Sequence, residues 1–235
     1  MNAEADADDS VLRLSLDAKA SVAVGAFSRG GRSRVTVKAV DHDFKPDAKL
    51  TPFGILLPHS GEVFLYFTDT RVTSDFIVDC LQDCWKTLRL RFPNVTRLVL
   101  NLDNGPENHS RRTQFMKRIT AFVDQFQLPV DLAYYPPYHS KYNPIERVWG
   151  VLEQHWNGSL MDGYQTVFNF ARTMTFRGIH PVVKHIQKTY PIGVKLTPKQ
   201  MALLEPRFER LTGLAKWFVR IVPLQPVTCS NIFLE

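Results

Sequence analysis

Three acidic residues occupy positions where local sequence patterns begin or end. Asp17 stands near the end of an alternating apolar and polar run, Asp103 follows a short apolar run, and Glu146 lies at the start of a helical pattern. Carboxylate oxygens in an open cluster are the ligands that Mg²⁺ or Mn²⁺ requires. Two such ions can activate a water or a 3′-hydroxyl and stabilise the leaving oxygen of a phosphodiester. We therefore take these three residues as candidate catalytic residues and metal ligands.

Each acid also has an ordinary explanation when it is considered alone. An Asp before Asn-Gly commonly forms a turn, and a Glu in a first helical turn is favoured by the helix dipole. Asp41 and Asp43 are alternatives to Asp17, but they lie in an irregular stretch that contains His and Pro. We favour Asp17 because a ligand carried by a strand is held more rigidly.

The first hundred residues read mainly as strands. Alternation predicts a strand over 11–17, and it resumes over 22–24. A Gly-Gly turn precedes a further strand over 35–40, whereas two prolines break the pattern over 41–52. The runs 54–58 and 62–68 flank a His-Ser-Gly turn and predict a hairpin, and Thr73 caps an amphipathic helix that follows it.

Strands and helices alternate after this helix. A buried strand is predicted over 95–103, a helix over 110–126 and a strand over 130–135. A further helix then begins with Asn143 as its N-cap and Pro144 as its first residue. This order predicts an α/β fold with a mixed sheet that has an antiparallel edge and is flanked by helices.

The chain divides into three predicted parts. Residues 1–10 form an acidic N-terminal tail, residues 11–160 form the core, and residues 161–235 form a helical C-terminal extension packed on that core. The extension contains three short helical patterns, over 164–174, 180–190 and 197–211, the last beginning at Thr197-Pro198.

Composition limits the class of protein. At 235 residues with 44% hydrophobic content, the chain can bury a full core, and default disorder is excluded. No apolar run reaches the roughly 18 residues of a membrane span, and the N-terminus does not resemble a signal peptide, so a cytoplasmic location is expected. The three cysteines are expected to be reduced. After residue 10, 29 basic residues face 19 acidic ones, which favours a polyanion as partner.

Several basic residues are candidate DNA contacts. They lie at a predicted hairpin tip, at a predicted helix start, and in or just after an aromatic loop that could stack unpaired bases. These residues are Arg29, Arg32, Arg34, Arg111, Arg112, His139, Lys141 and Arg147. The alternatives are solvated charged turns for the arginines and a core position for Tyr134 and Tyr135.

Two long segments carry a family resemblance. LNLDNGPENHSRR and YYPPYHSKYNPIERVWGVLEQHW closely resemble DDE transposases of the mariner superfamily and its bacterial insertion-sequence relatives, most nearly an ISAzo-type family. In that family an Asp-Asn pair ends a core strand, and a proline-rich aromatic loop leads into Asn-Pro-x-Glu-x-x-Trp. The resemblance extends upstream through SVAVGAFSRGGRSR and downstream through GVKLT, so it covers nearly the whole chain.

The resemblance implies a ribonuclease-H-like domain that cuts and joins DNA at transposon ends with two Mg²⁺ or Mn²⁺ ions. Asp17, Asp103 and Glu146 match the acidic ligands, although the 43 residues between the last two exceed the mariner spacing. It further implies a homodimer or a larger synaptic assembly that is nucleoid-associated when bound to DNA. Only about ten acidic residues precede the first predicted strand, so we expect the N-terminal helix-turn-helix of mariner-type transposases to have no counterpart in this sequence. Two alternatives are therefore a truncated, non-catalytic DNA-binding remnant and a ribonuclease-H-fold nuclease.

Overall fold

The computed structural model describes residues 2–25, 46, 48–136 and 142–224. The described helices are α1 (Asn2–Asp6), α2 (Ser74–Leu88), α3 (Thr113–Phe126), α4 (Glu146–Trp156), α5 (Tyr164–Thr173) and α6 (Pro198–Leu204), with a 3-10 turn at Glu205–Arg207. The described strands are β1 (Val11–Ala18), β2 (Val22–Val24), β3 (Ala48–Leu56), β4 (Val63–Thr68), β5 (Arg97–Leu102), β6 (Val130–Tyr134), β7 (Val182–His185), β8 (Phe208–Arg210) and β9 (Phe218–Ile221).

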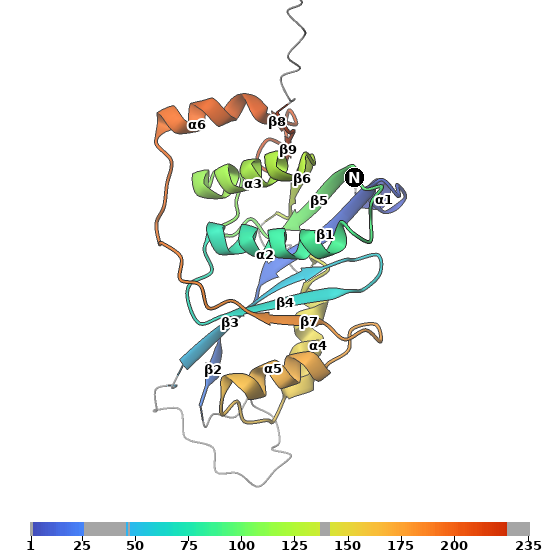
Figure 1. The fold of residues 1–235 in the computed structure, drawn as a ribbon, viewed down its shortest axis with the longest axis vertical. Helices are drawn as coiled ribbons and strands as arrows, with labels where there is room; N and C mark the ends of the chain where they lie inside the picture. Colours follow the sequence, from blue (N-terminus) through green and yellow to red (C-terminus); the bar gives the residue numbers. More distant parts are fainter. Residues whose placement is uncertain (1, 26–45, 47, 137–141, 225–235) are drawn as a thin grey trace, which may run out of the picture.

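One mixed sheet organises these elements. Its strand order is β7-β4-β3-β1-β5-β6-β9-β8, and β2 pairs with β3 off this path (Figure 1). β3 runs antiparallel to both β1 and β4, whereas β1, β5 and β6 run parallel. This central order, with one reversed strand beside β1, is the ribonuclease-H-like arrangement and confirms the predicted fold class.

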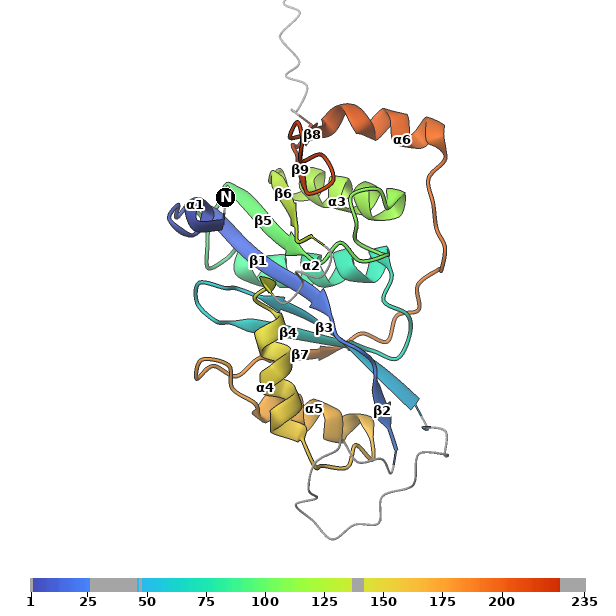
Figure 2. The same ribbon diagram turned by 180° about the vertical axis from the view of Figure 1, so that it is seen from behind.

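Helices cover both faces of the sheet. α2 and α3 lie on one face, and α4 lies on the other, as the view from behind shows (Figure 2). The first face buries a cluster that includes Phe53, Phe76 and Phe115, and the second buries one that includes Leu50 and Trp156. Strands β3 and β4 contribute to both clusters, because successive side chains of a strand point to opposite faces of the sheet.

Helix α2 follows its sequence prediction closely. Thr73 is its N-cap, and its hydroxyl accepts a hydrogen bond from the backbone N–H of Phe76 at 3.3 Å. The predicted apolar stripe is buried against the sheet, and it includes Cys80 and Cys84, which are both free thiols as expected. Burial raises the pKa of both thiols, which keeps them protonated.

Strand β3 begins earlier than the sequence pattern indicated. The predicted break extended to Pro52, yet the strand runs from Ala48 through that proline. The carbonyl of Pro52 accepts a hydrogen bond from the N–H of Lys19 at 2.9 Å, so the proline nitrogen faces the same neighbour. Proline has no N–H to donate to a neighbouring strand. Because β1 ends at Ala18, Pro52 lies just beyond the end of the pairing between β1 and β3, where this donor is not needed.

The acidic N-terminus contains a short helix. Residues 2–6 form α1, and Ala5 packs against Val11 and Val99. Arg13 donates hydrogen bonds to the carboxylate of Asp6, which neutralises part of the acidic run and holds it at the sheet. Residues 2–6 thus pack on the sheet, and the division of the chain at residue 10 stays a prediction.

The last part of the chain contains strands as well as helices. α5 and α6 confirm two predicted helices, and Thr197 forms a capping box at the start of α6 with Pro198 as first residue. The predicted helix over 180–190 is wrong, because Val182–His185 forms β7 parallel to β4. β9 and β8 extend the sheet beyond β6. The division of the chain at residue 160 stays a prediction.

None of the helices that the structure describes is long and apolar enough to cross a membrane.

Candidate functional site

Strand register brings two of the three predicted acids together. β1 and β5 are parallel neighbours, and Ser15 of β1 pairs with Asn101 of β5. Two residues further along each segment stand Asp17 and Asp103, so both side chains extend toward the same face of the sheet. That face is the one covered by α4, whose first residue is Glu146.

Asp17 is buried beneath α4. The residue is only 8% exposed, and the indole N–H of Trp149 donates a hydrogen bond to its Oδ2 at 2.8 Å. Burial, together with the charges of Asp103 and Glu146, raises the pKa of this carboxyl to about 7 against the lowering effect of the indole hydrogen bond. Asp17 therefore tends to keep a proton when no cation is near.

Asp103 is fixed by the turn that follows β5. Its Oδ1 accepts hydrogen bonds from the backbone N–H of Gly105 at 3.1 Å and from Asn108 Nδ2 at 2.7 Å. Between them, Asn104 adopts a left-handed conformation with φ 62°, which Asn tolerates well. A Cβ on Gly105 would lie 3.0 Å from Asp103 Oδ2, so glycine leaves that oxygen accessible.

Glu146 is positioned by a buried polar contact that the sequence did not reveal. Asn143 is not the N-cap of α4, which is Ile145. The Asn143 side chain turns inward, where its Oδ1 accepts from Ser15 Oγ at 2.5 Å and its Nδ2 donates to the carbonyl of Leu16 at 3.0 Å. These bonds tie the start of α4 to β1 beside Asp17.

The three carboxylates interact electrostatically. Burial raises the pKa of Glu146, the charge of Asp103 raises it further, and the charge of Lys19 opposes the shift. Lys19 also forms an ion pair with Glu153 at 3.0 Å. Within the described ranges, however, no three acidic, His or Cys side chains are close enough to form a ready-made metal site.

One further oxygen near these acids is unsatisfied. Oδ1 of Asn108 is buried and has no hydrogen-bond partner in the described part of the chain. It lies beside the same turn, 3.4 Å from where a Cβ of Gly105 would stand. A buried amide oxygen without a donor is costly unless a water or a cation fills the space beside it. Sequence reasoning missed Asn108 because nothing in its spacing distinguishes it.

The burial of Asp17 predicts a pH dependence of stability. Between pH 3.8, its ordinary pKa, and about 7, the folded metal-free chain holds a proton that the unfolded chain releases. The contribution of Asp17 to folding therefore falls as pH rises through this window. We expect Asp17→Asn to be more stable than the unsubstituted chain at pH 8, by on the order of 2 kcal/mol, and nearly equal at pH 4.

Urea unfolding in EDTA at the two pH values measures this difference. Asp9→Asn is the matched control, because Asp9 is exposed and its substitution should change stability equally little at both values. A stability difference between Asp17→Asn and the unsubstituted chain that does not grow with pH would contradict the prediction.

The predicted DNA contacts have different outcomes. Arg29, Arg32, Arg34, His139 and Lys141 lie outside the described residues, as do the alternative acids Asp41 and Asp43. Arg111 and Arg147 are exposed, and their DNA contacts stay predictions. Arg112 is largely buried and forms an ion pair with Glu107 at 3.0 Å, so its guanidinium already has a partner within the chain; its DNA contact also stays a prediction. Tyr134 is buried in β6, in agreement with the core alternative.

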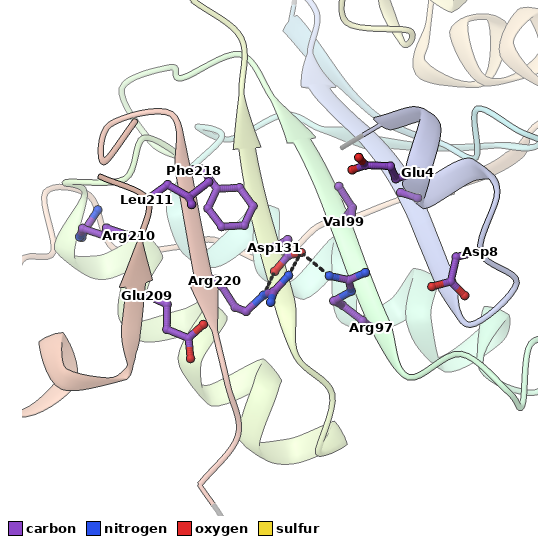
Figure 3. A pocket seen from close by; sticks show the side chains of 11 residues that line it. Glu4, Asp8, Arg97, Val99, Asp131, Glu209, Arg210, Leu211, Phe218 and Arg220 are labelled. Atoms are coloured by element: carbon purple, nitrogen blue, oxygen red, sulfur yellow. Dashed lines mark hydrogen bonds and ion pairs between the residues drawn. The ribbon is translucent and has the colours of Figure 1, made fainter. Parts of the chain in front are cut away.

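A separate hollow of about 430 Å³ lies between α1 and strands β8 and β9 (Figure 3). Asp131 of β6 is buried in its floor, and its carboxylate accepts hydrogen bonds from Arg97 and Arg220. These contacts satisfy the buried charge and join three strands of the sheet. None of the three candidate acids lines this hollow.

The fold and the site together define a class. A ribonuclease-H-like sheet with one acid near the end of β1, a second directly after β5 and a third at the start of α4 is the arrangement of the nuclease and transposase class. A model of the family described as Rhodopirellula transposase DDE domain matches residues 1–223. The chain therefore belongs to this DDE transposase family, which confirms the resemblance seen in the sequence.

Two solved structures are similar to the chain. The Mos1 transposase paired-end complex with left transposon end has 12% identity and a TM-score of 0.48, and the match covers 67% of this chain and 46% of that chain. The Mos1 mariner paired end complex with Mn has the same identity and TM-score, with 68% and 46% covered. The chain thus spans less than half the length of those Mos1 chains. No curated protein sequence matches it.

Proposed function

We propose that this chain performs metal-dependent DNA strand cleavage and strand transfer at the ends of an insertion sequence. The observation that carries the proposal is the convergence of Asp17, Asp103 and Glu146 on one face of the sheet, where the charge of Asp103 raises the pKa of both other carboxyls and the charge of Glu146 raises that of Asp17. Membership of the DDE transposase family supports the same reaction class. DNA ends and target DNA are the substrates in this proposal.

The residues present fit a divalent cation. Three carboxylates that repel one another, with the pKa of Asp17 raised to about 7, favour the arrival of positive charge. The donors are all oxygens, which Mg²⁺ and Mn²⁺ prefer, and the unsatisfied Oδ1 of Asn108 adds a further one nearby. Asp17, Asp103 and Glu146 would hold two ions. Bound ions would supply nucleophile activation and stabilisation of the leaving oxygen.

The chain's own residues orient these ligands. Gly105 and Asn108 hold one oxygen of Asp103, and Oδ2 of that residue accepts no hydrogen bond from the described residues. Trp149 holds one oxygen of Asp17. The charge of Lys19 favours ionised Glu146, which is the form that binds a cation. Such fixed ligands need little rearrangement when substrate arrives.

Cleavage of a labelled duplex that carries the element's own terminal repeat tests the proposal. We expect nicking at the repeat end with Mg²⁺ or Mn²⁺, none with EDTA, and none for Glu146→Gln. Transfer of the freed 3′ end to a second duplex would support the strand-transfer step. DNA binding without nicking would favour the non-catalytic alternative, and metal-dependent nicking without repeat preference or transfer would favour a nuclease.

The assembly and location of the protein remain predictions. A homodimer or larger synaptic assembly would bring two transposon ends together, and light scattering with and without end DNA would detect it. A monomer in both conditions would contradict this prediction.

A further inference from the structure

A groove lies at the edge of the sheet where β1 and β4 end. It is a hollow of about 480 Å³, and its walls include Lys49 and Thr51 of β3 and Arg71 in the connection between β4 and α2. Ala18, the residue after Asp17, and Glu107, in the loop that follows Asp103, also line it. This strand-end groove therefore adjoins the chain segments that carry Asp17 and Asp103.

The strand-end groove and the carboxylates lie on opposite faces of that edge. Leu50 of β3 belongs to the cluster beneath α4. Its neighbours Lys49 and Thr51 must point to the other face, which is the face covered by α2. Asp17 extends toward α4 and bonds to Trp149. A polymer bound at the carboxylates could therefore continue around the strand ends into the groove.

The charge of the groove suits a polyanion. Lys49 and Arg71 are both exposed, and neither forms an ion pair with a described carboxylate. Of the two acids in the lining, Glu107 is occupied by Arg112 at 3.0 Å and by the N–H of Ser74 at 3.2 Å. The other acid is Asp69. Among the described lining residues, the side chains of Lys49 and Arg71 therefore face one carboxylate that no cation neutralises.

Hydroxyl groups complete the lining. Ser21 Oγ and Thr51 Oγ1 are 2.8 Å apart, and Thr70 Oγ1 lies 2.8 Å from the hydroxyl of Thr68. Hydroxyls and flexible cations are typical contacts of phosphate oxygens and sugars. Val72 is the only large apolar side chain among the described lining residues, and no aromatic ring is present on which a base could stack.

We infer that the strand-end groove binds the phosphate backbone of the DNA strand that continues from the reactive phosphodiester, with Lys49 and Arg71 as the phosphate contacts. The inference rests on the proposed function and specifies a part of the substrate path. These two residues are positioning residues, because the groove lies on the face opposite the carboxylates. Recognition through the backbone carries no base sequence by itself.

Salt-dependent DNA binding tests this inference. The full chain is titrated in EDTA, which prevents cleavage, against a labelled random-sequence DNA duplex over a range of salt concentrations. For the double variant K49Q/R71Q we expect weaker binding and a log-log salt slope smaller in magnitude by about 2, since each phosphate contact contributes about 0.9. The conservative variant K49R/R71K should keep most of the slope.

A matched control removes the same charges elsewhere. Lys86 and Arg89 are exposed at the far end of α2 and form no ion pair with a described carboxylate, so K86Q/R89Q changes net charge equally. Equal salt slopes for the two double variants would contradict the assignment of the strand-end groove as the DNA-binding surface, but they would not contradict the proposed function. Absence of DNA binding by the unsubstituted chain would overturn both. Thermal unfolding of each variant verifies that it is folded.

Discussion

Replacing Asp103 by Asn is expected to reduce metal-dependent nicking by about 10³-fold, equivalent to about 4 kcal/mol of activation free energy. Asn has nearly the same shape as Asp, and its Oδ1 can still accept from Gly105 and Asn108. The turn after β5 should therefore be retained. What is lost is one negative charge in a cluster proposed to hold two divalent cations, so the effect should fall on the chemical step.

The same substitution should not weaken DNA binding or folding. Asp103 raises the pKa of both Asp17 and Glu146, so its removal relieves repulsion among the acids. We expect equal or tighter binding of duplex DNA in EDTA and equal or higher stability in urea. Asp9→Asn is the control, because Asp9 is exposed and precedes the start of β1, at the opposite end of that strand from Asp17.

Single-turnover nicking rates measure the effect. Asp9→Asn should nick at nearly the rate of the unsubstituted chain. If Asp103→Asn retained more than a tenth of that rate, the assignment of Asp103 as a metal ligand would be wrong.

The central sheet and the positions of the three acids along its elements could be predicted because their signals are local. Alternating residues define β1, and an apolar run defines β5. Once these strands are parallel neighbours, their register determines that Asp17 and Asp103 share a face. Glu146 was predictable because it follows a proline-containing loop and begins an amphipathic pattern.

The errors fall where tertiary contacts override local preference. Asn143 has the sequence context of an N-cap, but hydrogen bonds to Ser15 and Leu16, more than 120 residues away, occupy its amide. β7 is a four-residue edge strand, and its Val-Val-Lys-His sequence fits a strand or a helix until β4 provides backbone partners. Pro52 is tolerated in β3 only because β1 ends beside it.

The supporting residues of the site could not be predicted from spacing either. Trp149 packs α4 on the sheet with 3% of its surface exposed. Its hydrogen bond to Asp17 depends on how far α4 lies above β1. Gly54 of β3 sets that distance, since a Cβ there would lie 2.7 Å from the indole ring.

Trp149→Phe provides the second large effect, an expected loss of 10- to 100-fold in metal-dependent nicking, the range typical when a ligand's hydrogen-bond partner is removed. Phenylalanine keeps a ring against Gly54 but lacks the indole N–H. Oδ2 of Asp17 then loses a donor in a buried setting, which raises the pKa of Asp17 further above about 7. The acidic limb of the pH-rate profile should therefore move to higher pH, and more Mn²⁺ or higher pH should restore part of the rate.

Trp156→Phe separates this positioning role from packing. Trp156 is also on α4 and fully buried, but its indole N–H donates to Glu153 at 3.0 Å. Both substitutions remove similar volume from the same cluster, so they should lower stability by similar amounts. Only Trp149→Phe should shift the pH-rate profile. Equal shifts, or none, in the two variants would show that Trp149 serves packing alone, because the hydrogen bond to Asp17 is the feature that distinguishes the two indoles.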